Sequence, residues 1–328
     1  MDATFRIGYH ASHEQFKPSE LVSLVRRAEE AGFTDVLSSD HFYPWSQQQG
    51  ESGFAWSWLG AAMQATSMTY GIVNAPGQRY HPAVIAQAVA TLCELFPKRF
   101  WMAAGSGQYM NEHVTDLNWP AKVTRNERLV ECVQIMRALW RGETVTHEGL
   151  VKVYDARLYT LPDYTPTIIG AALTGPTARW LGGWADGMIT TSRRKVELRR
   201  IIDAFREGGG ENKPVYLKVQ LSYHENLSKA RALAHEQWRN NIFPSHLLSD
   251  IRSPEGFDAV GSTVREEDMD ASVRISNSLN QHLEWLIADM EAGVTGIYLH
   301  NVNLLQNEFI DQFGDKVLPE LIRKWRPS

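Results

Sequence analysis

The chain has 328 residues, of which 43% are hydrophobic and 22% are charged, so it can bury a large core and is not a disordered protein. Its 33 basic and 38 acidic residues give a formal charge of -5, which offers no electrostatic support for a nucleic-acid or anionic-membrane partner. No apolar run approaches the roughly 20 residues of a membrane-spanning helix, so we expect no membrane partner and a small-molecule substrate.

The cysteines and histidines indicate where the protein works and exclude a metal motif. Cys93 and Cys132 are the only two cysteines, and two thiols cannot build a disulfide framework. The N-terminus shows no signal-peptide pattern, so we expect a cytoplasmic protein. The 11 histidines form no recognisable metal-ligand motif, and we predict no metal site.

A strand followed by a helix recurs through the first half of the chain. Residues 4–9 are an apolar strand pattern, and Pro18 then opens a helix that ends before Gly32. Three further units are predicted, with strands at 35–39, 70–75 and 100–105 and helices at 56–68, 82–96 and 125–141.

The second half continues the alternation after a predicted hairpin at 143–160. Four more strands are predicted at 167–172, 187–191, 215–223 and 296–301, and an irregular stretch at 241–275. The helices of this half are predicted at 176–184, 195–207, 227–239, 278–292 and 305–324.

Eight strand–helix units predict an α/β fold, a (β/α)8 TIM barrel. A doubly wound open sheet shares the alternation but rarely needs eight parallel strands. No Gly/Ser/Pro-rich linker interrupts the chain, so we expect one barrel domain over residues 1–328, with insertions at about 107–124, 143–160 and 241–275.

Function is expected where the strands end, because barrel active sites are built at the C-terminal face. The sharpest cluster there contains Asp40, His41 and Trp45. An imidazole titrates near neutral pH, and an adjacent carboxylate can fix its tautomer. The structural alternative is that Asp40 caps a turn and His41 bonds the backbone.

Two glycine- or hydroxyl-bearing loops could receive a phosphorylated cofactor. The segment Gly105-Ser106-Gly107 lets a backbone approach a phosphate or flat ring closely, although such a motif alone is usually a tight turn. Thr174 and Thr177 frame a helix N-terminus, where ordinary capping is an equal explanation. Only together do these loops favour a cofactor.

Several segments resemble one family across nearly the whole chain: 7–12 (IGYHAS), 14–16 (EQF), 39–42 (SDHF), 44–45 (PW), 57–58 (SW), 79–88 (RYHPAVIAQA), 105–108 (GSGQ), 111–112 (NE) and 185–187 (ADG). They resemble the luciferase-like (bacterial luciferase superfamily) flavin and deazaflavin oxidoreductases. Within that family they are similar to the branch around the F420-dependent glucose-6-phosphate dehydrogenases, or to its clade that reverted to FMN. The resemblance implies the barrel fold, a flavin-type cofactor, either F420 or FMN, and commonly a homodimer.

The resemblance also implies roles for individual residues. His41 would take or stabilise the proton of a substrate hydroxyl, Asp40 would support the site electrostatically, and Trp45 would orient the substrate. The cofactor would be held by Asp40, Val73, Asn74, Ser106, Gly107, Gln108, Asn111, Ala172, Leu173 and Thr174, and the substrate by Trp45 and Arg194. The family has a bulge on the third strand, often with a non-proline cis peptide, and residues 72–74 fall at that place.

Three departures from the family keep the activity open. Gln108 stands where the dehydrogenases have a catalytic glutamate, and an amide cannot deliver a proton as an acid does. Leu173 and Thr174 replace paired glycines, and the basic residues that grip a sugar phosphate are matched only by residues 193–195. The leading hypothesis is hydride transfer between a small alcohol or aldehyde and the cofactor. The alternatives are an FMN-dependent monooxygenase and a non-catalytic flavin-binding protein.

Overall fold

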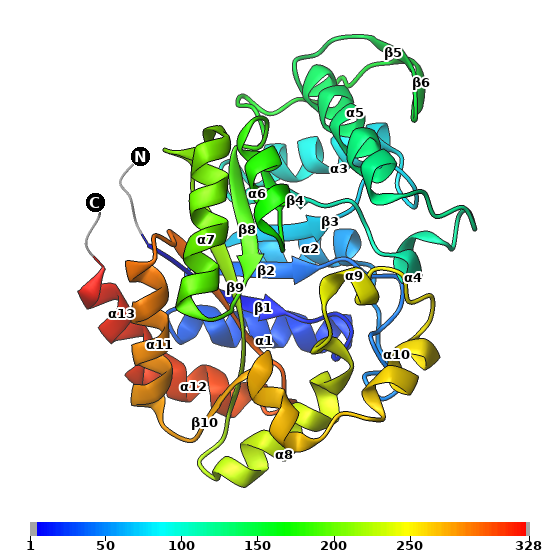
Figure 1. Cartoon of the computed structure of the whole chain (residues 1–328). Coiled ribbons are helices and arrows are strands. Elements are labelled where there is room, and N and C mark those ends of the chain that lie inside the picture. The colour runs from blue at the N-terminus through cyan, green and yellow to red at the C-terminus, as the bar shows by residue number, and fades with distance from the viewer. Residues whose placement is uncertain (1–4, 326–328) are drawn as a thin grey trace.

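The computed structural model describes residues 5–325 and contains a closed barrel of eight parallel strands (Figure 1). In barrel order the strands are β1 (Arg6–Ala11), β2 (Asp35–Ser39), β3 (Thr69–Asn74), β4 (Phe100–Ala104), β7 (Ile168–Ala171), β8 (Gly187–Thr191), β9 (Val215–Tyr223) and β11 (Gly296–Asn301). Pairing of β1 with β11 closes the ring. The predicted (β/α)8 fold is therefore confirmed, and the open-sheet alternative is wrong.

Helices surround the barrel and bury their apolar faces against it (Figure 1). In α1, Pro18 fits the first turn, where no backbone donor is needed, and Leu21, Leu24 and Val25 face the core. The main helices are α1 (Pro18–Glu30), α2 (Ala55–Ala65), α3 (Pro82–Leu95), α5 (Lys122–Trp140), α6 (Gly175–Gly182), α7 (Lys195–Phe205), α8 (Leu227–Trp238), α11 (Leu279–Glu291), α12 (Gln306–Lys316) and α13 (Leu318–Lys324). In the described part of the chain, no helix combines the length and apolar character needed to cross a membrane.

Some predicted boundaries are wrong. The helix expected at 305–324 is two helices, because Pro319 cannot donate a backbone hydrogen bond and starts α13 instead. The helix expected at 56–68 ends at Ala65. The first strand lies at Arg6–Ala11, and residue 4 of the predicted strand lies outside the described residues.

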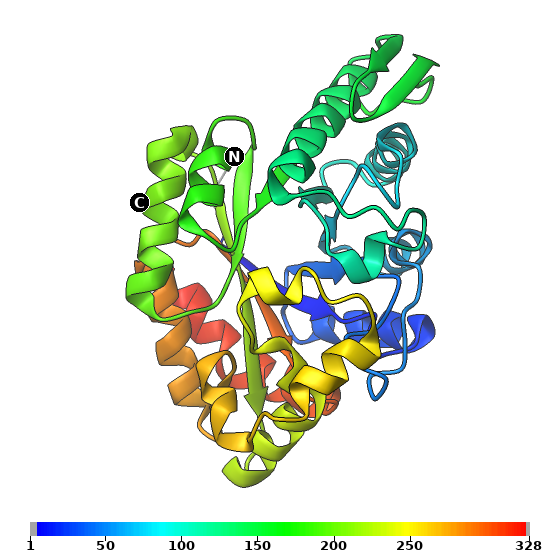
Figure 2. The same cartoon turned by 45° about the vertical axis from the view of Figure 1, so that its right-hand side comes forward.

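The stretch expected to be irregular, 241–275, contains short elements. They are α9 (Ser245–Leu248), α10 (Pro254–Gly261), the 3-10 turn η3 (Glu266–Ala271) and β10 (Arg274–Ser276), which pairs with β9 outside the closed ring. The segment 107–124 contains α4 (Tyr109–Glu112), while β5 (Val145–Glu148) and β6 (Lys152–Ala156) form an antiparallel hairpin. Figure 2 shows α5 and this hairpin extending away from the barrel.

Aromatic side chains fill the half of the barrel interior nearer the N-terminal ends of the strands, called here its lower half. Trp101, Tyr216 and Tyr298 form one buried cluster there, with ring centroids 5.0 to 5.7 Å apart. Gly8 and Gly71 are required opposite them, since a Cβ at either position would lie 2.1 Å from the ring of Tyr298 or Trp101. Side chains alternate along a strand, so the next inward positions belong to a separate, upper layer.

The segment 241–275 packs beside the C-terminal ends of the strands. Phe257 of α10 contacts Trp45 with ring centroids 5.2 Å apart. The backbone N–H of Tyr109 donates to Ser249 over 2.9 Å, and the indole of Trp119 donates to Asp250 over 2.9 Å. In Figure 1 the arrowheads of β1, β2 and β3 point toward the side where α4, α9 and α10 lie. This segment thus forms a cover, residues 241–275, over that face of the barrel.

Candidate active site

His41 and Glu14 come together where two neighbouring strands end. Glu14 follows β1 and His41 follows β2, and Nδ1 of His41 forms a short hydrogen bond with Oε1 of Glu14. The other oxygen of Glu14 accepts a hydrogen bond from the hydroxyl of Ser12 over 2.8 Å. Burial alone would raise the pKa of Glu14, but the charge and hydrogen bond of His41 outweigh it and hold that pKa well below its usual range.

This arrangement fixes the role of each imidazole nitrogen. Since Nδ1 of His41 faces a carboxylate, that nitrogen carries hydrogen and Nε2 is the one free to accept a proton. The His41 side chain is 19% exposed, so it is reachable, whereas the Glu14 side chain is 2% exposed. A reachable imidazole held by a buried carboxylate is an arrangement that can act as a general base.

Asp40 lies beside this pair but contacts other groups. Its carboxylate accepts hydrogen bonds from Asn74 over 2.7 Å, Tyr80 over 3.0 Å and the indole of Trp56 over 3.2 Å. The guanidinium of Arg79 lies 3.4 Å from the same carboxylate and also donates to the Asp40 carbonyl. The carboxylate that meets the His41 ring is thus that of Glu14, and Asp40 ties the ends of β2 and β3 together.

Trp45 forms an apolar wall next to the base. Its ring lies perpendicular to that of His41, with centroids 4.7 Å apart. The Trp45 residue is 8% exposed, and its backbone N–H donates to Gln49. Because Phe257 of the cover also packs against Trp45, the indole is restrained beside His41.

The loop after β4 is bonded to the His41 segment. Gly107 has φ of +81°, and a Cβ there would lie 2.9 Å from Glu112, so glycine is needed at this position. Asn111 accepts hydrogen bonds from the backbone of Phe42 and Tyr43 over 2.8 and 3.3 Å. Gln108 is partly buried beside it, with its Oε1 3.5 Å from the Asn111 amide nitrogen, and Ser106 opens the same turn.

The ends of β7 and β8 meet through Arg193. Its guanidinium donates to the carbonyl of Leu173 over 3.1 Å and to the hydroxyls of Thr190 and Thr191 over 3.4 and 3.3 Å. Thr174 caps α6, which leaves a helix N-terminus beside a guanidinium. Burial lowers the pKa of Arg193 from its ordinary value.

Other predicted residues of this region differ in exposure. Ala172 is buried and Leu173 is exposed, so only the latter presents its side chain to solvent. The Arg194 side chain is 87% exposed and pairs with Glu197 on its own helix. The structure therefore places Arg194 at the rim, away from His41.

The third strand is regular. β3 pairs with β2 and β4 without any shift of register, and no peptide bond in residues 5–325 is cis. The expected bulge at 72–74 is therefore wrong, because Val73 and Asn74 continue the ladder opposite Ser39 and Ala104. The carbonyl oxygen of the buried Asn74 side chain has no hydrogen-bond partner.

Sequence reasoning gave no chemical role to four residues that the structure places at this end of the barrel, although it expected His10 and His300 among the polar groups at the strand ends. Glu14 was part of a family-like segment, and the signal that it meets His41 is that both follow adjacent strands. His10, His300 and Lys218 point inward from β1, β11 and β9, one layer above the tyrosines. Their alternation with Gly8, Tyr298 and Tyr216 was the signal available in the sequence.

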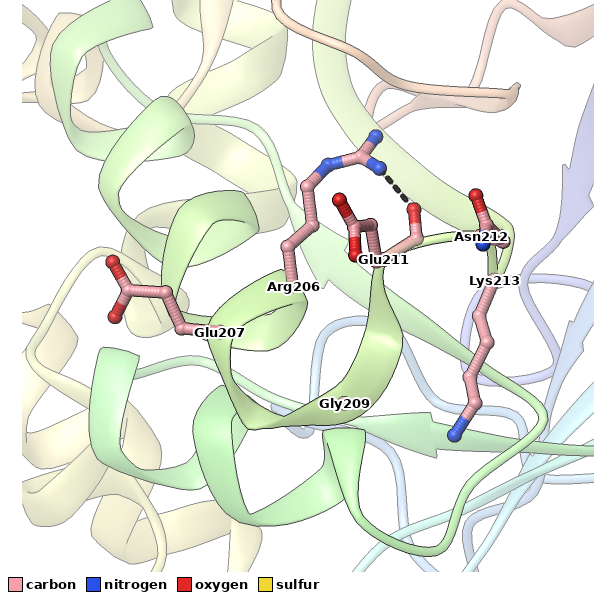
Figure 3. A pocket seen from close by; sticks show the side chains of 6 residues that line it. All are labelled: Arg206, Glu207, Gly209, Glu211, Asn212 and Lys213. Carbon is pink, nitrogen blue, oxygen red and sulfur yellow. Dashed lines mark hydrogen bonds between the residues drawn. The ribbon is translucent and has the colours of Figure 1, made fainter.

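A separate pocket lies at the opposite end of the barrel, between the π-helical turn η1 (Arg206–Gly210) and β9 (Figure 3). Arg206 donates there to the carbonyl of Glu211, and Lys213 also lines the pocket. It precedes β9, so it lies on the face opposite His41. Within residues 5–325, no group of three or more histidine, cysteine, aspartate or glutamate residues could hold a metal ion.

The closed barrel thus carries an imidazole–carboxylate pair, a tryptophan and a glycine loop at its C-terminal face, where TIM-barrel enzymes have their active sites. The family model for the luciferase-like monooxygenases matches residues 2–296. The chain belongs to this family, which confirms the predicted resemblance.

Relatives cover the full length of the chain. An F420-dependent glucose-6-phosphate dehydrogenase of Beutenbergia cavernae is 34% identical over 96% of this chain and 97% of its own. One from Microbacterium testaceum is 32% identical over 99% of this chain and 100% of its own. Among solved structures, an F420-dependent secondary alcohol dehydrogenase with an F420–acetone adduct is 28% identical, with a TM-score of 0.89 over 96% of this chain and 98% of that one.

Proposed function

We propose that the protein is an F420-dependent dehydrogenase that interconverts a small alcohol and its carbonyl compound. The observation that carries the proposal is the His41–Glu14 pair, which presents a free imidazole nitrogen beside Trp45 at the C-terminal face of the barrel. Relatives that match the whole chain, and a structural relative at 28% identity, bear names of F420-dependent dehydrogenases.

The residues present fit a flat, phosphorylated cofactor. The buried side-chain oxygen of Asn74 lacks a partner and can accept a hydrogen bond from a ring N–H. Gly107 keeps the loop after β4 free of a side chain, and Thr174 with Arg193 provides hydroxyl and guanidinium donors at the start of α6. When bound, F420 supplies the hydride acceptor or donor.

The protein's own residues supply the proton chemistry and the positioning. Nε2 of His41 accepts the proton of the substrate hydroxyl, and the carboxylate of Glu14 stabilises the imidazolium that forms. Trp45 holds the carbon skeleton of the substrate against the base. The cover packs on Trp45 and excludes water from that side.

Gln108 sets the limits of this proposal. A glutamine cannot donate a proton as an acid, so the proton chemistry rests on His41, which carries the alcohol-derived proton in one direction and returns it in the other. The non-catalytic alternative predicts that neither wild type nor Gln108→Glu turns over any candidate alcohol while both bind cofactor. Turnover by wild type removes that alternative.

An FMN-dependent monooxygenase is the other alternative that the sequence raised. The monooxygenases among the structural neighbours, such as an EDTA monooxygenase at 12% identity, share the fold alone and give this alternative no specific support. The homodimer that the family resemblance implies stays a prediction, which light scattering on the purified protein would check.

The proposal is tested by anaerobic titration of the purified protein with F420 and with FMN. Binding is monitored by absorbance and fluorescence. We expect tight binding of F420, followed by its reduction when small secondary alcohols are added. Binding of FMN alone, with oxygen consumption by the reduced complex, would replace the proposal with the monooxygenase alternative.

A further inference from the structure

A cluster of one lysine and two histidines, His10, Lys218 and His300, lies in the barrel interior near its C-terminal end. Burial holds the pKa of both histidines well below the ordinary value, so Lys218 carries the charge of the cluster. Lys218 follows Tyr216 on β9 by two positions, and His300 follows Tyr298 on β11 by two positions. Because Tyr216 and Tyr298 face the barrel interior, Lys218 and His300 face it as well, one layer nearer the C-terminal end. His10 enters the same layer from β1, and its ring centroid lies 4.4 Å from that of His300.

The hydrogen-bonding capacity of this cluster is not satisfied by the protein. His10 and His300 are 3% and 1% exposed, and the Nδ1 atom of each is buried without a hydrogen-bond partner. Nε2 of His300 meets the side-chain oxygen of Gln15 over 3.3 Å, so this imidazole donates on that side. Buried polar groups normally have partners, and two adjacent unpartnered imidazole nitrogens indicate a missing ligand.

The charge of the cluster is also compensated only in part. In the described residues, no carboxylate forms an ion pair with Lys218, whose ammonium instead lies 5.4 Å from the ring centroid of Trp238. Glu14 is the anion that acts on Lys218, but its two oxygens are already bonded to His41 and Ser12. Burial lowers the pKa of Lys218 to about 8, because the charge of Glu14 offsets the loss of water only in part.

The cluster and His41 lie at the same end of the barrel, because His10 stands on β1 four positions before Glu14, which bonds to His41. We propose that Lys218, with Nδ1 of His10, binds the carboxylate of an acidic substrate whose hydroxyl is presented to His41. The ammonium of Lys218 matches the single charge of a carboxylate, and the hydrogen of a His10 Nδ1–H can be donated to it, whereas Nδ1 of His300 can only accept. The substrate class is then a small hydroxy acid or oxo acid.

This inference rests on the proposed function only in treating the bound anion as a substrate. The exposed Arg194 at the rim is the rival anion site, since it lies in the loop where the family resemblance places a phosphate-gripping residue. If the anion binds at the cluster, Lys218→Met should lose anion binding, and if it binds at the rim, Arg194→Met should lose it. A test of binding therefore separates them without any turnover.

The experiment uses the full chain without cofactor and two probes of equal shape, propanoate and propanamide. Binding is followed by the imidazole nitrogen signals of His10 and His300 in NMR spectra and by calorimetry. We expect propanoate to bind at least about 10-fold more tightly than propanamide, as a hydrogen bond to a charged group implies. Lys218→Met should abolish this preference and Lys218→Arg should keep most of it.

Lys229→Met is the matched control, because Lys229 is an exposed lysine on α8 and the substitution changes the net charge equally. It should leave the preference for propanoate intact. Equal binding of the two probes, no detectable propanoate binding, or a preference that survives Lys218→Met would overturn the proposal. Loss of the preference in Arg194→Met alone would place the anion at the rim and overturn it too.

The outcome is independent of the cofactor titration. If the preference for propanoate holds but F420 does not bind, the anion site stands and the dehydrogenase proposal falls. If F420 binds and alcohols reduce it while the preference is absent, the dehydrogenase proposal stands and the substrate is uncharged. With both in place, 2-hydroxypropanoate should be a better substrate than propan-2-ol.

Discussion

Substitution of Glu14 by glutamine tests the general base most directly. The side chain keeps its shape and can still accept the hydrogen of His41 Nδ1, so the tautomer is preserved and only the negative charge is lost. A hydrogen bond to a charged group contributes about 1.5–3 kcal/mol and a neutral one about 1 kcal/mol, so the loss is about 0.5–2 kcal/mol. That difference corresponds to about a 2–30-fold lower kcat.

The effect should fall on kcat rather than KM. The imidazolium forms only as the proton is taken, so Glu14 stabilises the transition state more than the bound substrate. The assay is steady-state reduction of F420 by an alcohol, with F420 affinity measured separately as the control for folding. Ser12→Ala, which removes only the 2.8 Å hydrogen bond to the far oxygen of Glu14, should have a smaller effect.

The reasoning is refuted by one pattern of results. If Glu14→Gln keeps the wild-type kcat while His41→Ala loses turnover, the carboxylate plays no part in the proton step. Equal losses in kcat and in F420 affinity would instead show that Glu14 acts by holding the cofactor site together. Glu14→Ala should lose more activity than Glu14→Gln, because it also releases Nδ1 of His41.

Three further predictions follow from the same geometry. His41→Ala should lose at least about 100-fold in kcat, the usual contribution of a general base, with F420 affinity unchanged in fluorescence titration; full activity would remove His41 from the mechanism. Gly107→Ala should lower the free energy of unfolding in urea by about 1–2 kcal/mol, because the φ angle of Gly107 is +81°. The control Gly60→Ala, in the helix α2, should raise it by up to about 1 kcal/mol, and equal effects of the two substitutions would contradict this account. Below pH 8 the free energy of unfolding of Lys218→Met should exceed that of wild type by about 1–3 kcal/mol. This gain should vanish as the pH rises from about 8 to about 10.5, because in that window the unfolded wild-type chain holds the lysine proton and the folded chain does not. A difference in the free energy of unfolding that does not change with pH would count against this account.

The barrel could be predicted from the sequence because each strand is a short apolar run followed by an amphipathic helix. That local pattern survives packing unchanged, as in β2 and β9, whose predicted bounds agree with the structure. Boundaries that depend on a single residue were harder to predict, and the division of the last helix rests on Pro319. The cover was missed as structure because α9 is only four residues long and is positioned by contacts with residues far away in the chain.

The candidate site was only partly predictable. His41, Asp40 and Trp45 stand close together in the sequence, so adjacency alone singled them out. Glu14 lies 27 positions from His41, and their contact follows only when β1 and β2 are paired in register. The partners of Asp40 likewise come from α2, β3 and the loop after it, which no sequence spacing relates.

The contact between His10 and His300 has a consequence for how the protein is made. These rings belong to the first and last strands of the barrel, and Gln15 donates to Val302 across the same seam. A chain emerging from the ribosome contains both Glu14 and His41 early, yet it cannot form this seam until almost the whole sequence has been synthesised. A ligand that needs the closed ring binds only the fully folded protein. Its binding therefore shifts the equilibrium of ring closure toward the closed barrel by mass action.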